Sequence, residues 1–185
     1  MAKTLSSMLP LGTHAPHFSL LDVKSDKKIR VDNNQDSTAT VIMFICNHCP
    51  FVKHVNKELT RVANDYMNKG VRFLAINAND VQQYPDDSPE NMKRTAQQEQ
   101  YPFPYLFDET QEVARAYHAT CTPDFFLFDK NMTLVYRGQL DDSRPGNGIE
   151  VNGNCIRQAL DCVLSEKAVS IDQKPSIGCN IKWRE

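Results

Sequence analysis

Two cysteines three positions apart, Cys46 and Cys49, stand where an apolar segment gives way to an amphipathic one. Residues 40–45 are almost continuously apolar and rich in β-branched side chains, which is typical of a strand buried on both faces. Residues 51–66 repeat apolar side chains at helical spacing, and Pro50 suits the first helical turn because its missing N–H costs nothing there. The sequence therefore predicts a strand, a turn that carries both thiols, and a helix.

The rest of the chain alternates short strands with amphipathic helices. Gly70 is expected to end the first helix, and Val71–Asn77 is a second apolar strand, so the two strands should be parallel with a right-handed crossover. The other expected elements are hairpins at 17–23 with 28–31 and at 125–129 with 134–138, a strand at 105–107, and helices at 91–100, 109–117 and 152–164. This order predicts one α/β domain over residues 1–185 with a thioredoxin-like fold: a central mixed β-sheet flanked by helices, an N-terminal β-hairpin, and a C-terminal tail (168–185) that packs on the domain.

Composition and charge indicate an ordinary water-soluble domain. Of the 185 residues, 41% are hydrophobic and 24% are charged, and the formal net charge is −2. These values favour a folded core over disorder, and they argue against nucleic acid or an anionic membrane as a partner. No apolar run approaches the ~20 residues that span a bilayer. Residues 1–17 lack an apolar stretch of signal-peptide length, so we expect a cytoplasmic protein.

The spacing of Cys46 and Cys49 predicts redox chemistry. A cysteine at the N-terminal end of a helix is stabilised as a thiolate by unpaired backbone N–H groups and by the helix dipole. Because only the thiolate attacks a disulfide, lowering the thiol pKa from about 8.5 toward neutrality creates a usable nucleophile. We predict that Cys46 occupies this position and attacks, and that Cys49, one turn inside the helix, resolves the mixed disulfide. The predicted activity is thiol–disulfide oxidoreduction.

A structural metal site and a non-catalytic redox sensor are two other interpretations of the pair. Structural zinc takes four ligands, usually from two paired motifs, and the sequence has no second Cys-x-x-Cys. His48 and His54 overlap the first motif and do not form a separate second half. We therefore expect neither a metal nor another cofactor. A sensor would use the same dithiol as a switch, and multiple turnover separates a catalyst from it.

His48 and Pro123 are predicted to act with the thiol pair. His48 lies between the cysteines, where it can donate a hydrogen bond or a positive charge to the Cys46 thiolate and make the disulfide more oxidising; the alternative is an exposed loop residue. Pro123 precedes a predicted strand. A cis-proline there would set its backbone beside the cysteines, where it could pair with an extended substrate peptide. A trans loop proline is the alternative.

Five segments spread over nearly the whole chain are specific enough to suggest a family. They are Gly12-Thr-His-Ala15-Pro16-His-Phe18-Ser-Leu20-Leu-Asp22, Cys46-Asn-His-Cys49-Pro50-Phe-Val52, Cys121-Thr122-Pro123-Asp124-Phe-Phe-Leu-Phe-Asp129, Tyr136-Arg-Gly138-Gln-Leu-Asp141-Asp142-Ser-Arg144-Pro and Pro175-Ser-Ile-Gly178-Cys179-Asn-Ile-Lys-Trp183. Together they resemble the thioredoxin-like redoxins related to the alkyl hydroperoxide reductase/thiol-specific antioxidant family. The resemblance implies the thioredoxin-like fold and a cis-proline at Pro123.

Thiol-dependent peroxide reduction, a peroxiredoxin-like antioxidant activity, is the main alternative. Peroxidases of that family carry the motif Pro-x-x-x-Thr-x-x-Cys. If Cys49 were the peroxidatic cysteine, the proline and threonine would stand where the chain has Ile42 and Cys46; if Cys46 were, they would stand at Ala39 and Met43. The hydroxyl that would hold peroxide is missing in both registers. This favours the oxidoreductase.

Cys121 and Cys179 are candidates for additional redox thiols. Cys121 stands two residues before Pro123, and Cys179 lies in the tail, whose apolar residues can pack back onto the domain. We hypothesise that the tail brings Cys179 close to Cys121 or Cys46, as a third redox thiol or a gate; buried thiols that serve packing are the alternative. The expected partners are protein or small-molecule disulfides and thiols and a recycling reductant, without nucleic acid or membrane.

Overall fold

The structure is a computed structural model that describes residues 3–33 and 36–184. Positions 1, 2, 34, 35 and 185 of the predicted domain, the last of them the end of the predicted tail, lie outside these residues. The strands are β1 (Lys3–Leu5), β2 (Phe18–Asp22), β3 (Lys27–Val31), β4 (Ala39–Phe44), β5 (Val71–Asn77), β6 (Tyr105–Phe107), β7 (Cys121–Thr122), β8 (Asp124–Asp129), β9 (Leu134–Gly138) and β10 (Ile177–Asn180). The helices are α1 (Pro50–Met67), α2 (Pro89–Gln98), α3 (Glu112–Ala116), α4 (Asn154–Leu164) and the short 3₁₀ helix η1 (Pro85–Asp87).

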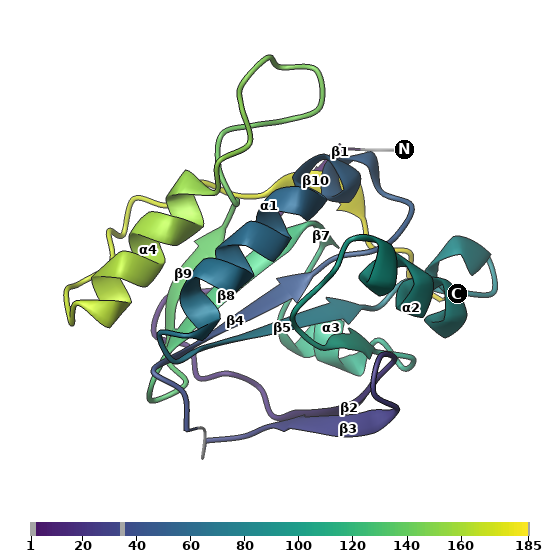
Figure 1. Ribbon diagram of the computed structural model, residues 1–185, viewed down its shortest axis with the longest axis horizontal. Helices are drawn as coiled ribbons and strands as arrows, with labels where there is room; N and C mark the ends of the chain where they lie inside the picture. The colour runs from purple at the N-terminus through teal and green to yellow at the C-terminus, as the bar shows by residue number, and fades with distance from the viewer. Residues whose placement is uncertain (1–2, 34–35, 185) are drawn as a thin grey trace.

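A seven-stranded mixed sheet forms the centre of the molecule (Figure 1). Its order is β3-β2-β6-β5-β4-β8-β9; β5 runs parallel to β4 and β6, and the other neighbours are antiparallel. Helices α1 and α4 cover one face of this sheet, and α3 covers the other. This is the thioredoxin-like α/β architecture that the sequence predicted. Within the described ranges, every helix is too short or too polar to cross a lipid bilayer.

Strand β4 lies in the middle of the sheet, and each of its residues is buried. Val41 and Met43 belong to the core under α1 and α4, whereas Ile42 and Phe44 belong to the core on the opposite face. Side chains of a strand alternate between the two faces, so a strand that is covered on both must be apolar throughout. The burial of β4 explains the apolar run in the sequence. It also fixes the point at which the chain leaves the sheet toward the two cysteines.

Most predicted elements are present, with ends shifted by a few residues. The predicted strands 71–77 and 105–107 coincide with β5 and β6. Helix α1 ends at Met67, three residues earlier than predicted from Gly70. Gly70 lies in the turn that follows, where its φ of +85° is a conformation that glycine adopts without a steric penalty.

A second sheet, which the sequence did not predict, ties both ends of the chain to its middle. Its three strands have the order β1-β10-β7 and are antiparallel. Strands of two to four residues are too short to leave a recognisable alternation in the sequence. Figure 1 shows β10, in yellow, beside the N-terminal end of α1. The tail therefore reaches the segment that carries the thiol pair.

Candidate active site

Cys46 and Cys49 lie between β4 and α1, but their place relative to the helix differs from the prediction. Helix α1 begins at Pro50, and Cys49 is its N-cap residue, with extended φ and ψ of −70° and 123°. Cys46 precedes this N-cap by three residues. The prediction that Cys46 starts the helix, with Cys49 one turn inside, is therefore wrong. The reason is Pro50, because its ring disfavours the helical conformation in the preceding residue.

The N-cap position favours a thiolate on Cys49. A hydrogen bond from the Cys46 thiol lowers the pKa of Cys49 to about 5, together with donors from the Cys179 thiol and the backbone N–H groups of Val52 and Cys179, and against the raising effect of burial. The carbonyl oxygen of Thr122 lies 3.2 Å from Cys49 Sγ and opposes the charge. One such acceptor is outweighed by the surrounding donors. The resting negative charge of the pair thus belongs on Cys49.

Cys46 holds the proton of the pair. The hydrogen bond to Cys49 raises the pKa of Cys46 well above its ordinary value, and burial and the negative charge of Asp87 add to this effect. The hydroxyl of Thr122, 3.3 Å from Cys46 Sγ, acts in the opposite direction. The two thiols share one proton, so Cys46 becomes the thiolate when that proton moves away.

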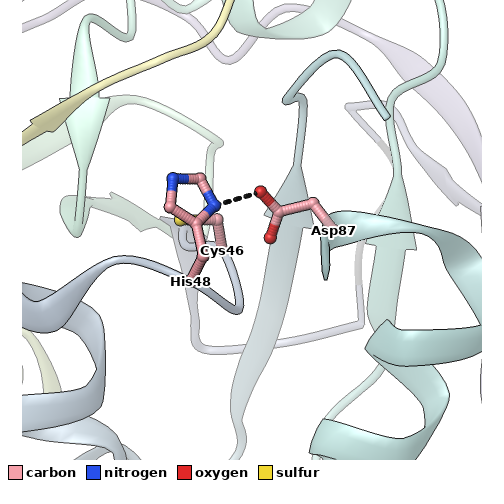
Figure 2. Close-up of side chains that lie close together, drawn as sticks. All are labelled: Cys46, His48 and Asp87. Carbon is pink, nitrogen blue, oxygen red and sulfur yellow. Dashed lines mark hydrogen bonds and ion pairs between the residues drawn. The ribbon is translucent and has the colours of Figure 1, made fainter. Parts of the chain in front are cut away.

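The imidazole of His48 is fixed by a buried carboxylate that sequence analysis missed. His48 Nδ1 lies 2.6 Å from Asp87 Oδ2, and Figure 2 shows the carboxylate pointing at the ring with the Cys46 sulfur behind it. Asp87 also accepts from Asn79 Nδ2 at 2.8 Å and from the backbone N–H of Asn47 at 2.7 Å. Burial would raise the pKa of Asp87, but these three donors lower it. Asp87 therefore carries a negative charge beside His48.

The open side of the His48 ring faces the interior. Tyr84 stacks on the ring, with centroids 5.4 Å apart and an interplanar angle of 16°. The Nε2 atom of His48 is buried and has no hydrogen-bond partner among the residues that the structure describes. With Nδ1–H donating to Asp87, Nε2 is left as a proton acceptor.

Cys46, His48 and Asp87 also form a group of potential metal ligands. One ligand atom from each residue lies within 4.8 Å of the other two. The Asp87 carboxylate already accepts three N–H donors, as is typical of a carboxylate that orients a histidine. Cys46 and His48 alone fall short of the four ligands of a structural zinc site. The donor set suits proton transfer to and from sulfur better than metal binding.

The residue that precedes Pro123 contacts both cysteines of the pair. The Thr122–Pro123 peptide bond is cis. Thr122 contacts Cys46 through its hydroxyl and Cys49 through its carbonyl oxygen, at 3.3 and 3.2 Å. The predicted site residues Cys46, Cys49, His48 and Pro123 are therefore brought together. Asp87, Asn79 and Thr122 join them, and no local sequence pattern marked these three.

The tail cysteine lies against a different thiol from the ones that we expected. Cys179 Sγ is 2.8 Å from Cys49 Sγ, whereas the sequence suggested Cys121 or Cys46 as its neighbour. Cys121 is adjacent through the strand pairing of β7 with β10. Burial raises the pKa of Cys121 far above the ordinary thiol value, so this residue is a poor nucleophile. Each of these four cysteines exposes at most 2% of its surface.

The pKa of Cys49 gives a test of this charge distribution. We expect the ultraviolet absorbance of the thiolate to fall as the reduced protein is acidified, with a midpoint near pH 5. The lowered pKa stabilises the folded state most fully above the ordinary thiol pKa of about 8.5, and this contribution is lost as the pH falls through 5. Cys49→Ser should abolish the transition, and Cys162→Ser, on α4, should leave it unchanged. A midpoint near 8.5 in the parent protein would contradict the assignment.

Several solved structures resemble this chain. The structure of an uncharacterized conserved protein from Geobacillus kaustophilus is 62% identical, with a TM-score of 0.96, over 100% of this chain and 97% of that one. A hypothetical protein from Sinorhizobium meliloti 1021 is 46% identical, with a TM-score of 0.95, over 98% of each chain. A secreted disulfide oxidoreductase from Mycobacterium tuberculosis is 16% identical, with a TM-score of 0.60, over 78% of this chain and 95% of that one, and this likeness concerns the fold.

Family-level comparison agrees with the resemblance inferred from the sequence. No functionally curated protein matches the chain. The model of the AhpC/TSA family matches residues 11–137, a range that includes β2 to β8, the two cysteines and Pro123. The chain is a thioredoxin-like redoxin that belongs to the AhpC/TSA family.

Proposed function

We propose that the protein catalyses thiol–disulfide exchange with Cys46 and Cys49 as its dithiol. The observation that carries this proposal is the position of two buried thiols just before and at the start of α1, both in contact with Thr122, the residue before the cis-proline. The two thiols share one proton, so one of the two sulfurs is a thiolate at neutral pH. The other sulfur lies within hydrogen-bonding distance of it and can complete an exchange.

In the proposed reaction Cys46 attacks and Cys49 resolves. As the shared proton moves to Cys49 or to His48, the Cys46 thiolate attacks one sulfur of a partner disulfide, and the other partner sulfur leaves as a thiolate. Cys49, after loss of its proton, attacks Cys46 and releases the second partner sulfur. Two electrons and the shared proton pass to the partner, which takes a second proton from water, and the protein ends with a Cys46–Cys49 disulfide. A recycling thiol reductant then reduces the Cys46–Cys49 disulfide and regenerates the dithiol.

The surroundings of the two sulfurs support this division of roles. Cys49 Sγ is enclosed by Cys179, Thr122 and the first turn of α1. Cys46 lies beside the Thr122 hydroxyl and exposes 2% of its surface, whereas Cys49 exposes none. A partner therefore reaches Cys46 with the smaller local movement. Asp87 acts as a positioning residue, because it orients the His48 ring and keeps Nε2 open for a proton.

A turnover assay tests the proposed function. The protein should catalyse the reduction of insulin, or of a small disulfide such as hydroxyethyl disulfide, by dithiothreitol over many cycles. Multiple turnover is the result that a non-catalytic redox sensor cannot produce. Stoichiometric oxidation of the protein without turnover on either disulfide would reject catalysis. Rapid mixing with hydrogen peroxide tests the peroxidase alternative, and oxidation of Cys46 and Cys49 at free-thiol rates would remove it.

His48 is expected to raise the reduction potential of the pair. In His48→Ala the Asp87 carboxylate loses its 2.6 Å hydrogen bond to the imidazole, and its negative charge, which raises the pKa of Cys46, disfavours the thiolate form. We expect the potential to fall by ~30 mV or more, equivalent to about 1.4 kcal/mol. Titration against glutathione redox buffers measures this, and His54→Ala, on α1, serves as the control. An unchanged potential in His48→Ala would exclude the role.

A further inference from the structure

Strand β10 lies where an extended partner peptide would pair with the residue before the cis-proline. Cys179 is the register partner of Thr122, and Asn180 is the partner of Cys121, in an antiparallel ladder. Edge-strand pairing of this kind is a common way for a protein to bind a peptide. Here the occupant is the protein's own tail. It presents a cysteine at the position opposite Thr122.

The tail approaches this edge more closely than a side chain would allow. A Cβ atom at Gly178 would lie 1.9 Å from the carbonyl oxygen of Thr122 and 2.6 Å from its carbonyl carbon. Only a residue without a Cβ permits this approach. The residue just before Cys179 therefore lets the backbone of β10 seat against the site.

Hydrogen bonds on the other side of Cys179 hold the tail in place. The backbone N–H of Lys182 donates to Asn79 Oδ1 at 2.8 Å, and the N–H of Ile181 donates to the carbonyl of Thr120 at 3.0 Å. Asn79 also donates to Asp87 through Nδ2. One asparagine thus connects the tail to the carboxylate that orients His48. The position of Cys179 is defined by the same network as the active site.

The contact between the tail and the thiol pair is a sulfur–sulfur contact. Cys179 Sγ lies 2.8 Å from Cys49 Sγ. A disulfide bond is about 2.03–2.05 Å long, so a movement of less than about 1 Å would join the two atoms. Among the residues that the structure describes, Cys49 thus has both Cys46 and Cys179 as sulfur neighbours.

We propose that Cys179 is a third redox thiol, which takes over the disulfide first formed between Cys46 and Cys49. This step rests on the proposed function, because the partner disulfide supplies the oxidation. The sulfur of Cys179 attacks Cys49, the Cys46–Cys49 bond breaks, and Cys46 leaves as a thiolate that accepts the proton lost by Cys179. The step exchanges one disulfide for another without net oxidation. It locks the tail onto the site and frees Cys46 for another partner.

The charge environment of Cys179 changes in favour of this step after oxidation. In the reduced protein, burial is the main factor that raises the pKa of Cys179, followed by its hydrogen bond to Cys49 and the charge of Cys49. In the Cys46–Cys49 disulfide, Cys49 carries no charge, so the last two effects are absent. The positive charge of Lys182, which lowers the pKa, remains. Oxidation of the pair therefore makes Cys179 easier to deprotonate.

Peptide mapping distinguishes the two disulfides directly. The reduced protein is oxidised with one equivalent of diamide, the free thiols are blocked with N-ethylmaleimide in acid, and the denatured chain is cut with trypsin without reduction. Cys46 and Cys49 share the tryptic segment 31–53, whereas Cys179 lies in 168–182. A Cys46–Cys49 bridge leaves 31–53 as a single peptide. A Cys49–Cys179 bridge joins the two peptides and leaves the blocking group on Cys46.

The expected result is the joined peptide, with Cys46 blocked, in at least a tenth of the oxidised protein. Cys179→Ser should lose it and retain the Cys46–Cys49 bridge, and Cys162→Ser should match the parent. If the parent forms only the Cys46–Cys49 bridge between pH 6 and 9, or joins Cys179 to Cys121, the inference is wrong and the proposed function stands. If neither Cys46 nor Cys49 enters any bridge, the proposed function fails together with it.

Discussion

Cys46→Ser is expected to abolish multiple turnover, with a loss of at least roughly 10³-fold in rate. A serine hydroxyl cannot form a disulfide, so both the attack on the partner and the closing of the protein disulfide are lost. The fold should tolerate the change, because serine is close to cysteine in size and Thr122 Oγ1, 3.3 Å from Cys46 Sγ, can hydrogen-bond to the new hydroxyl. The insulin assay measures the rate, and thermal unfolding checks the fold.

Two further variants complete the assignment of roles. Cys49→Ser retains the attacking thiol and is expected to accumulate the mixed disulfide with the partner, visible as a mass increase under non-reducing conditions. Cys162→Ser, half-buried on α4, should turn over like the parent protein. The low pKa of Cys49 makes the reverse order of attack the sharpest rival. Turnover that survives in Cys46→Ser, or a mixed disulfide trapped in that variant, would overturn the assignment.

Gly178→Ala is expected to destabilise the folded protein strongly. The added Cβ would lie 1.9 Å from the Thr122 carbonyl oxygen, a backbone atom that cannot rotate away. Strand β10 must therefore separate from β7, with loss of their hydrogen bonds and of the Cys49–Cys179 contact. We expect a cost of at least about 3 kcal/mol. For a chain of this length that corresponds to a fall in Tm of roughly 6–12 °C.

Gly146→Ala is the matched control for this effect. Gly146 has a φ of +82°, and no atom of the described residues lies within 4 Å of its expected Cβ, whereas Gly178 is required only by the lack of space for a side chain. The control variant should therefore lose only the roughly 1–2 kcal/mol of a left-handed alanine. Thermal and urea unfolding of both variants give the comparison. Equal losses in the two would show that β10 is not tightly seated at Thr122.

The residues of the active site differ in how far the sequence could reveal them. Cys46, His48 and Cys49 lie within four consecutive positions of one turn, so their association is local. Asp87 is 39 residues from His48, at the end of the short 3₁₀ helix η1 in a polar segment without periodicity, and only the packing of η1 beside the thiol turn gives it a partner. Cys179 is 130 residues from Cys49. The sequence around a tail cysteine does not indicate which thiol it will contact in the folded protein.

What the sequence determined by itself is the strand, the thiol turn and the helix that follows, and with them the fold class. The continuous apolar run requires a strand covered on both faces, and the spacing of apolar residues after Pro50 requires a helix packed on one side. The tertiary structure decided which thiol carries the charge, which carboxylate orients His48, and which cysteine the tail presents. These three features depend on Pro50, which places the N-cap at Cys49, and on contacts between segments that are distant in the chain. Local periodicity shows which side chains share a face of a helix or strand, but not which residues that face will contact.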